Sequence, residues 1–480
     1  MKQYLYLVSL VLLFLTSCGS SSVRDAPKQE ILTLFPIENY SQNVDDWINP
    51  KDTGYDIPLL TNDLQQKHFA KFYDRYYENN SPWSAENITK KLNSTAPHDI
   101  STIIKNRLVS FSNKEKPAHQ ISYGENFRPH PDEWINQIAH NINISQFNNL
   151  KYSLNNRAIA IDNLCARALP TDDVHFYSHK IAGEGYPFDN LQMFSIWAGT
   201  PLYIIGTTKD HAWSLVQSPD VLAWVKSNGI ARTDIKFVNQ WKKQAKMQLA
   251  AITNTKTSIL DSKGNFLFYA YIGSVFPMIN DNTGTKLMVP DVVNGYAVIK
   301  YAKISKQHIS IMPTLATPRN IATILKGLVG RPYGWGNAYF YNDCSAELKS
   351  LYTPFGIWLP RHSAHQAELG EVVDMSHSTP EQRLDYLMKN GKPFFTIVYI
   401  NGHVVMYLGN YPNPQNKREL MAMSYHNKWG LKSVEEENTR IILGGGVFLP
   451  ILLQYPEMPH VKSLAAEQYF KVVFLDVCEE

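Results

Sequence analysis

The sequence is poor in cysteine, with four in 480 residues, at positions 18, 165, 344 and 478. Small exported domains that rely on disulfides carry many more, usually in even number. Three remain when Cys18 is assigned to the targeting segment discussed below, so at least one thiol is free. The sequence also allows a Cys165–Cys478 bridge. Scarce cysteine therefore excludes a disulfide scaffold and makes each thiol a candidate reactive group.

The chain also lacks a strong charge of either sign. Its 46 Lys and Arg and 43 Asp and Glu give a formal net charge of +3, and loss of Lys2 with a cleaved signal leaves +2. That charge is too small for a nucleic-acid-binding footprint, so we expect no nucleic-acid partner. The hydrophobic content of 44% is ordinary for a globular protein, and the length suggests about three or four domains.

Long hydrophobic runs are absent as well. The one sustained apolar stretch, Leu5–Leu15, is shorter than the roughly 20 residues of a membrane span and follows Lys2. It ends in Leu15-Thr16-Ser17-Cys18, which resembles a bacterial lipobox, in which the Cys becomes the lipid-carrying N-terminus. We predict a lipoprotein signal peptide at 1–17; the alternative is an ordinary secretory signal that happens to contain a Cys.

The residues after Cys18 suit a tether between an anchor and a folded body. Gly19 and three serines begin a flexible segment predicted at 18–31. Because Gly19 is not Asp, the segment is similar to lipoprotein sorting signals that favour the outer membrane. We therefore expect a body anchored through lipid on Cys18, on the periplasmic face of the outer membrane.

Three regions precede the last third of the chain. Residues 32–155 are mixed and partly helical: Phe69, Phe72, Tyr73 and Tyr76 fall at helical spacing before Pro82, and we read them as a packing face rather than a ligand site. A second helix is expected over 131–141. Residues 156–235 and 248–311 each hold several short β-rich runs bounded by turn residues, which predicts two small β-barrels in tandem.

The last region, 314–480, has helices first and strands second. A helix is expected to open at Asn320 or Thr323 and to end near Gly330, and another to cover Ser345–Tyr352. A hairpin is expected around Asn401-Gly402. The chain is therefore predicted to be α+β, with an α+β domain behind two all-β barrels and a partly helical N-terminal segment.

This last region carries the residues of a thiol enzyme. Cys344 follows Asp343, a good helix N-cap, and a helix N-terminus favours the thiolate. His403 starts a predicted strand beside a turn glycine, and His426 fits a neighbouring strand. One imidazole can accept the thiol proton and the other can orient it. The plainer interpretations, an inert buried Cys344 and a structural strand histidine, are weakened because all three occur in one domain.

The last region contains five motifs that, taken in order, resemble those of a known family. They are, in order, Tyr333-Gly334-Trp335-Gly336, Asp343-Cys344-Ser345, Leu359-Pro360-Arg361, Gln366 and Gly402-His403-Val404. Together they resemble the NlpC-type family of bacterial cell-wall cysteine peptidases, whose catalytic domain is papain-like, over about 314–477. More loosely, 188–192, 199–201 and 223–225 resemble the bacterial SH3-like barrels of one branch, and the first region resembles its N-terminal clip segment.

The resemblance implies hydrolysis of the γ-D-glutamyl–diamino-acid bond in peptidoglycan stem peptides or muropeptides, with a preference for a free N-terminal L-Ala and with no cofactor. By position, Cys344 is the nucleophile, His403 the base and His426 the orienting residue. The residues expected to contact substrate are Asp343, Ser345, Ser363, Tyr333 and Trp335. Two oxygens on Asp343 would allow helix capping and binding of a substrate ammonium together. Among barrel residues, Glu184, Tyr186 and Trp213 are candidates for closing the cleft.

The sequence departs from the family pattern at three positions. Asn337 and Ala346 stand where Gly is common, and His362 stands where an acidic residue is frequent. Competing hypotheses are an amidase or endopeptidase acting on intact cross-linked wall and a non-enzymatic wall-binding lipoprotein. A metal enzyme is disfavoured because His362 and His365 lack a convincing third ligand motif, so no metal site is predicted. The sequence gives no oligomeric state.

Overall fold

The computed structural model describes residues 34–282, 284–414, 416–435 and 439–478. The predicted signal peptide, the tether and the lipidation residue Cys18 lie outside this range. Within it, none of the helices is both long enough and apolar enough to cross a membrane. The three cysteines in the described part of the chain are free, so the Cys165–Cys478 bridge that the sequence allowed is not formed.

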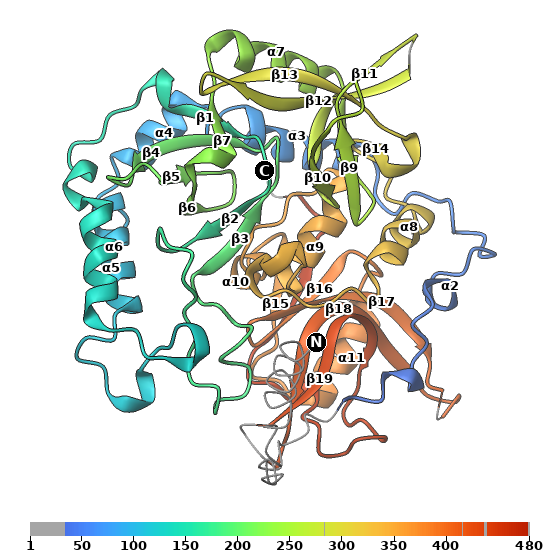
Figure 1. Cartoon of the computed structure of the whole chain (residues 1–480). Helices are drawn as coiled ribbons and strands as arrows, with labels where there is room; N and C mark the ends of the chain where they lie inside the picture. The colour runs from blue at the N-terminus through green and yellow to red at the C-terminus, as the bar shows by residue number, and fades with distance from the viewer. Residues whose placement is uncertain (1–33, 283, 415, 436–438, 479–480) are drawn as a thin grey trace, which may run out of the picture.

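The predicted α+β fold class is confirmed. The last region forms a six-stranded sheet with helices against it, drawn in orange and red in Figure 1. The strands, in sheet order, are β15 (Glu371–Asp374), β20 (Phe470–Phe474), β16 (Thr396–Ile400), β17 (His403–Pro412), β18 (Leu420–Lys432) and β19 (Arg440–Ile451). The helices are α8 (Pro318–Leu328), α9 (Cys344–Tyr352), α10 (Ser363–Gln366) and α11 (Pro380–Asn390).

The two barrels share one twelve-stranded sheet. The first contributes β1 (Arg157–Ala160), β2 (Leu164–Arg167), β3 (Gln192–Ile196), β4 (Pro201–Thr207), β5 (Trp213–Gln217), β6 (Leu222–Lys226) and β7 (Ile230–Arg232). The second contributes β8 (Leu249–Ile252), β11 (Val275–Asp281), β12 (Gly284–Val293), β13 (Tyr296–Lys303) and β14 (Ile309–Ile311). A parallel bridge between Tyr296 and Arg232 connects β13 to β7. Strands β9 (Lys256–Leu260) and β10 (Phe266–Tyr271) pair separately, and α7 (Ile235–Met247) lies between the barrels in sequence.

Several strands of the barrels were not predicted. They are β2, β3, β7, β8, β11 and β14. Strand β3 carries Gln192 and Ser195, and β11 contains Pro277, so neither offers an uninterrupted run of β-favouring residues. Pairing with distant strands, such as Cys165 opposite Ser195, holds β2 and β3 together. Tertiary pairing therefore overrides weak local preference at these positions.

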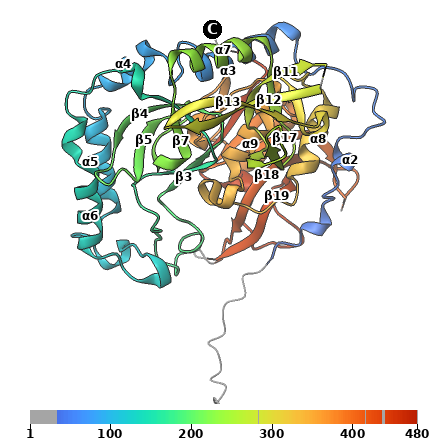
Figure 2. The ribbon, with the colours of Figure 1, turned by 45° about the horizontal axis from the view of Figure 1, so that its top comes forward.

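The N-terminal region contributes to all three cores. Its helices are α2 (Val44–Trp47), α3 (Asn62–Tyr77), α4 (Ala85–Leu92), α5 (Ile100–Phe111) and α6 (Asp132–Ile142). Phe35 and Tyr40 are buried in the peptidase core, Phe72 and Trp83 in the core of the second barrel, and Ile104 among residues of the first. Both ribbon views show α5 and α6 beside the first barrel and α2 beside α8 (Figures 1 and 2). This region therefore acts as a clip.

The predicted helix start in the last region was wrong. Helix α8 begins at Pro318, and the hydroxyl of Thr317 accepts a hydrogen bond from the backbone amide of Asn320. Thr at the N-cap and Pro at the first helical position satisfy the free amides and preset the backbone angle. The helix therefore opens before Asn320 and Thr323, the two predicted starts.

Candidate active site

Cys344 is the first residue of α9. Asp343 is the N-cap, as predicted, and its Oδ1 accepts a hydrogen bond of 3.0 Å from the amide of Ala346. The thiol is partly buried and receives a hydrogen bond from the backbone amide of Val404, the residue after His403. The start of β17 therefore lies against the thiol, and the positive end of α9 faces it as well.

His403 and His426 are brought together by two neighbouring antiparallel strands. The turn at Asn401 and Gly402, both with positive φ, ends where β17 begins at His403. Strand β18 runs back beside β17 with Tyr425 opposite Met406. As a result, Nε2 of His403 lies 2.7 Å from Nδ1 of His426, and both rings are buried.

The tautomers follow from the role each nitrogen must have. If Nδ1 of His403 is to accept the thiol proton, Nε2 of His403 carries its hydrogen and donates it to Nδ1 of His426. His426 then carries its own hydrogen on Nε2. That atom is buried and has no hydrogen-bond partner among the described residues. The second imidazole therefore serves the first as an acceptor.

The electrostatics keep this group uncharged at rest. Burial raises the pKa of Cys344 to about 11, with Asp343 adding to the rise, while the Val404 amide, Lys428 and Arg361 oppose it. Burial also lowers the pKa of His403 well below its usual value and that of His426 to about 3, and Lys428 lowers both further. An attack by this thiol on a carbon centre would therefore require transfer of its proton to an imidazole.

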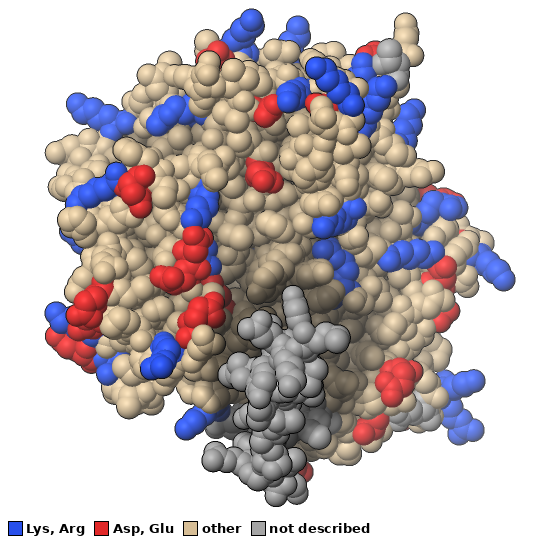
Figure 3. Space-filling view, in the orientation of Figure 1, with Lys and Arg blue, Asp and Glu red and all other residues tan. Residues whose placement is uncertain are grey.

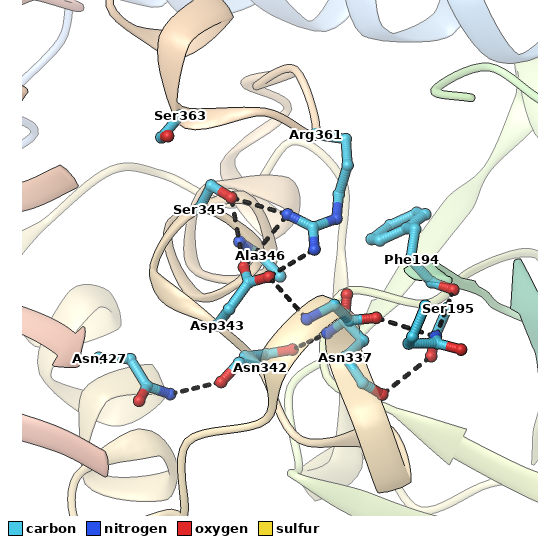
Figure 4. Close-up of polar contacts among 12 residues, drawn as sticks. Phe194, Ser195, Asn337, Asn342, Asp343, Ser345, Ala346, Arg361, Ser363 and Asn427 are labelled. Atoms are coloured by element: carbon cyan, nitrogen blue, oxygen red, sulfur yellow. Dashed lines mark hydrogen bonds and ion pairs between the residues drawn. The ribbon is translucent and has the colours of Figure 1, made fainter. Parts of the chain in front are cut away.

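A second polar cluster lies beside Cys344 (Figure 4). Arg361 contacts Asp343 with two nitrogens, at 3.2 Å to Oδ1 and 2.5 Å to Oδ2. Its Nη1 also donates to the hydroxyl of Ser345 at 2.8 Å, and that hydroxyl donates to Asp343 at 3.2 Å. Gly336 donates its amide to Oδ2 at 3.1 Å. The cluster ties the N-terminus of α9 to two flanking loops.

The Asp343 carboxylate is already fully used in this arrangement. A carboxylate offers about four lone-pair positions, and Asp343 has contacts from Ala346, Ser345, Gly336 and both terminal nitrogens of Arg361. The sequence suggested that its two oxygens could cap α9 and bind a substrate ammonium together. A substrate ammonium would instead have to displace one of these donors.

The other predicted contact residues surround the same cluster. The Ser363 hydroxyl donates to the carbonyl of Gly402 at 2.9 Å, which places it next to His403. Tyr333 lies close enough to Cys344 and Asp343 for both to contribute to the rise of its pKa, although burial is the larger cause. Trp335 is 37% exposed. Ser363 and Tyr333 thus lie near His403 and Cys344, and Trp335 directly precedes Gly336, whose amide contacts Asp343.

The first barrel supports the loop that approaches Asp343. From β3, Gln192 donates to the carbonyl of Gly336 at 2.9 Å, and Ser195 donates to the carbonyl of Asn337 at 3.2 Å (Figure 4). Gly336 has a φ of +59°, and a Cβ there would lie 2.2 Å from the carbonyl oxygen of Gln192. Asn337 has a φ of +62°, which Asn tolerates better than most residues, so its departure from Gly is accommodated.

A buried hydrogen-bond network next to the candidate nucleophile was not predicted from the sequence. Glu347 of α9 accepts hydrogen bonds from Asn342 at 2.7 Å and from the hydroxyl of Tyr425 at 2.5 Å. Asn427 donates to the carbonyl of Asn342 at 3.0 Å. Burial raises the pKa of Glu347. This network fixes α9 on β18. Its only local signal in the sequence is that Tyr425 and Asn427 directly flank His426.

A loop of the first barrel crosses to the peptidase domain. The ring of Phe188 packs edge-on against Trp335 and Trp429, with centroid distances of 5.6 and 4.7 Å. Burial raises the pKa of Glu184 in the same loop, and Arg440 opposes the rise. Tyr186 is exposed and hydrogen-bonds the Tyr339 hydroxyl. These contacts place the loop beside the candidate site.

Trp213, the pair His362 and His365, and the surface charge were also considered in the sequence, and none of them forms part of the candidate site. Trp213 lines a cavity of about 580 Å³ between the barrels, with Phe268 of the second barrel in the same lining. The rings of His362 and His365 lie 5.7 Å apart, and the described residues include no cluster of His, Cys, Asp or Glu suited to a metal ion. Acidic and basic residues are interspersed over the face in Figure 3.

Sequence comparisons agree with this arrangement in order and position. Models of four families match: the NLPC_P60 N-terminal stabilising domain at 7–147, an SH3 domain of SH3b1 type at 175–226, an SH3 domain of SH3b2 type at 234–281, and NlpC/P60 at 330–434. Residues 330–434 therefore form a domain of the NlpC/P60 family, and the other three matched domains precede it. The NlpC/P60 match spans Cys344, His403 and His426.

The fold is similar to that of a solved structure over nearly the full length of the chain. An NlpC/P60 endopeptidase from Photobacterium damselae subsp. piscicida is 26% identical, with a TM-score of 0.79 over 94% of this chain and 100% of that one. An NlpC/P60 family protein from Bacillus cereus is 14% identical, with a TM-score of 0.40 over 60% of this chain and 83% of that one. The comparison with curated proteins gave no match.

Proposed function

We propose that this protein is a cysteine endopeptidase that cleaves the γ-D-glutamyl–diaminopimelate bond of peptidoglycan stem peptides. The observation that carries the proposal is the buried pair His403–His426, joined at 2.7 Å, next to a thiol at the start of a helix. A wall-binding protein has no use for a buried imidazole pair on a strand whose first residues contact a thiol, as the Val404 amide contacts Cys344. The NlpC/P60 family match over the same residues supports the reaction class.

Each residue has one part in the proposed reaction. Cys344 attacks the γ-carbonyl carbon of the D-glutamyl residue while His403 takes the thiol proton, and a thioester forms. His403 returns the proton to the leaving amine as the carbon–nitrogen bond breaks. Water, deprotonated by His403, then hydrolyses the thioester and restores the thiol. His426 keeps Nε2 of His403 protonated throughout.

The preference for a free N-terminal L-Ala is part of the same proposal. The Phe188 loop packs on Trp335 and Trp429 next to the candidate site, where it would narrow the space beyond the second substrate residue. Tyr333, Ser345, Ser363 and Asp343 are the proposed contacts, with the ammonium replacing one of the donors now held by Asp343. A blocked amine brings extra bulk and no charge to this end of the site.

A periplasmic, lipid-anchored location completes the proposal. It rests on the Leu15–Cys18 pattern, which lies outside the described residues. Replacing Cys18 by Ala in the full chain and measuring its distribution between membrane and soluble fractions tests it. Unchanged membrane association would contradict anchoring through Cys18.

The activity test uses residues 19–480 with L-Ala-γ-D-Glu-meso-diaminopimelate and its N-acetylated form, with products identified by mass spectrometry. We expect L-Ala-D-Glu from the free peptide, much less from the blocked one, and none with Cys344→Ala. Equal cleavage of both peptides would remove the amine preference. Cleavage of neither would contradict the proposed bond, and intact wall would be tested next.

A further inference from the structure

A small cationic pocket adjoins the two histidines. It has a volume of about 110 Å³ and lies between the β16–β17 turn, the overhanging end of β18, the start of β19 and the segment before β20. Its charged and amide-bearing lining residues are Asn401, Lys428, Lys432, Arg440, Lys462 and Glu467. Four cations thus surround one carboxylate. We refer to these six residues as the cationic pocket.

The single carboxylate is already engaged. Oε2 of Glu467 lies 3.0 Å from Nζ of Lys462 and 3.5 Å from Nζ of Lys432, and it also accepts from Asn401 at 3.5 Å. Glu467 is 7% exposed. Glu467 therefore forms its ion pairs with Lys462 and Lys432, and none with Lys428 among the described residues.

Among the cations of the pocket, Lys428 is the one whose charge acts on the candidate catalytic residues. It is half-buried, two residues after His426, and its ammonium takes part in none of the hydrogen bonds and ion pairs found among the described residues. Its charge acts on Cys344, His403 and His426, and on Lys432, Arg440 and Glu467 in the pocket. Removing part of the water around an ammonium is costly unless an anion takes the place of that water.

The reaction itself decides which part of the substrate lies there. His403 must return its proton to the leaving nitrogen, so the leaving residue lies beside His403. The pocket begins at Asn401, two residues before His403, and at Lys428, two residues after His426. The polar cluster of Asp343, Ser345 and Arg361 lies instead at the N-terminus of α9 and the loops packed on it. The leaving half of the substrate therefore extends toward the cationic pocket.

We propose that the cationic pocket binds a carboxylate of the diamino acid released by the reaction, with Lys428 as its main contact. This inference rests on the proposed function, because the leaving residue of that substrate is diaminopimelate. Diaminopimelate carries one carboxylate more than lysine, at the end of its side chain. The pocket thus makes the enzyme selective for an acidic leaving residue, and Lys428 determines specificity without taking part in bond cleavage.

The test compares two substrates that differ in one charge: L-Ala-γ-D-Glu-meso-diaminopimelate and the same peptide with its side-chain carboxylate amidated. We expect the wild type to show a KM for the acid roughly tenfold lower than for the amide, as one charged hydrogen bond provides. Lys428→Met is expected to raise KM for the acid by about that factor and to leave the amide within about twofold. Lys462→Gln, at the far side of the pocket, is expected to do the same more weakly.

Two controls separate the possible failures. Lys236→Met, an exposed lysine on α7, should change neither KM. Affinities of both peptides for the Cys344→Ala protein, measured by calorimetry with and without Lys428→Met, give a readout that needs no turnover. If Lys428→Met changed KM and affinity equally for the acidic peptide and the amidated peptide, the proposal that the cationic pocket binds the carboxylate would be overturned. Absence of cleavage by the wild type, with acid still bound in preference to amide, would overturn the proposed reaction and retain the pocket.

Discussion

Nε2 of His403 and Nδ1 of His426 lie 2.7 Å apart inside the protein, away from solvent. A single hydrogen atom lies between these two nitrogens. The tautomer of His403 therefore depends on whether Nδ1 of His426 accepts a hydrogen bond. The far nitrogen of His426 has no partner among the described residues. The pair therefore depends on Nδ1 of His426 alone.

A first prediction concerns that atom. His426→Leu removes the acceptor, lets His403 adopt either tautomer and is expected to lower kcat by roughly 10²–10⁴. His426→Asn retains an oxygen near the position of Nδ1 and should keep more of the activity. Steady-state kinetics on the tripeptide, with circular dichroism to verify folding, measures both. Equal losses in the two variants would show that the ring does not act through Nδ1.

The second prediction is the shape of the pH profile. Burial lowers the pKa of His403 well below 6.5, so the base stays neutral and kcat/KM should remain high to below pH 6.5. On the alkaline side, burial lowers the pKa of Lys428 from 10.5 to about 8. Loss of its charge should raise KM for the acidic substrate near pH 8.

Lys428→Met serves as the control for that limb. The groups that face Lys428 are Cys344, Glu467, Lys432 and Arg440, with His403 and His426 alongside. With Lys428 removed, KM should no longer change near pH 8, while the acid limb should remain. An unchanged alkaline limb in the variant would assign it to another group.

A third prediction concerns stability in acid. His426 is buried and its pKa is lowered from 6.5 to about 3, so the unfolded chain binds a proton that the folded chain refuses between these values. The stability that the neutral ring contributes is complete above pH 6.5 and is lost as pH falls toward 3. Urea unfolding followed from pH 7 to 4 should show a shallower decline for His426→Leu than for the wild type. Parallel curves would contradict the assignment.

The fourth prediction uses two glycines. Gly336→Ala adds a Cβ 2.2 Å from the Gln192 carbonyl oxygen at a φ of +59°, whereas Gly295→Ala meets nothing within 4 Å at a φ of +79°. Backbone strain alone costs about 1–2 kcal/mol, which both variants share. Gly336→Ala should lose more stability than that and also lower kcat, because Gly336 contacts Asp343. Similar losses in urea unfolding and no effect on kcat would contradict this.

A fifth prediction addresses the interface between the first barrel and the peptidase domain. Nζ of Lys349 on α9 lies 2.8 Å from Oδ1 of Asp220, and both side chains are buried. Asp220→Ala leaves a buried ammonium and should cost about 3–5 kcal/mol of unfolding free energy, whereas Asp220→Leu with Lys349→Met should cost much less. The exposed pair Lys389–Asp385, also at 2.8 Å, should lose only about 0.3–0.5 kcal/mol. Additive losses in a double-mutant cycle would contradict a buried pair.

Local features of the site could be predicted from the sequence. Asp343 predicts a helix N-terminus at Cys344, and Asn401-Gly402 predicts the hairpin that carries His403. Both predictions succeed because an N-cap and a turn involve only residues that are close in sequence. The contacts of Gln192 and Ser195 with Gly336 and Asn337 join residues about 140 positions apart, as does Lys349 with Asp220 at a separation of about 130. No local pattern encodes such a contact. The role proposed for Lys428 could not be predicted for the same reason, because the pocket around it is formed by four separate segments of the chain.

The clip has a consequence for how this enzyme is made. Phe35 and Tyr40, among the first described residues, are buried against Tyr455 and its neighbours near the end of the chain. The hydrophobic interior that shapes the active site is therefore finished only after synthesis of the last strands, when the earliest segment docks on them. The last domain therefore does not fold independently of the N-terminal segment. A chain truncated at either end lacks part of this hydrophobic core, and the core positions Cys344. Full-length synthesis is therefore required before the site around Cys344 can be assembled.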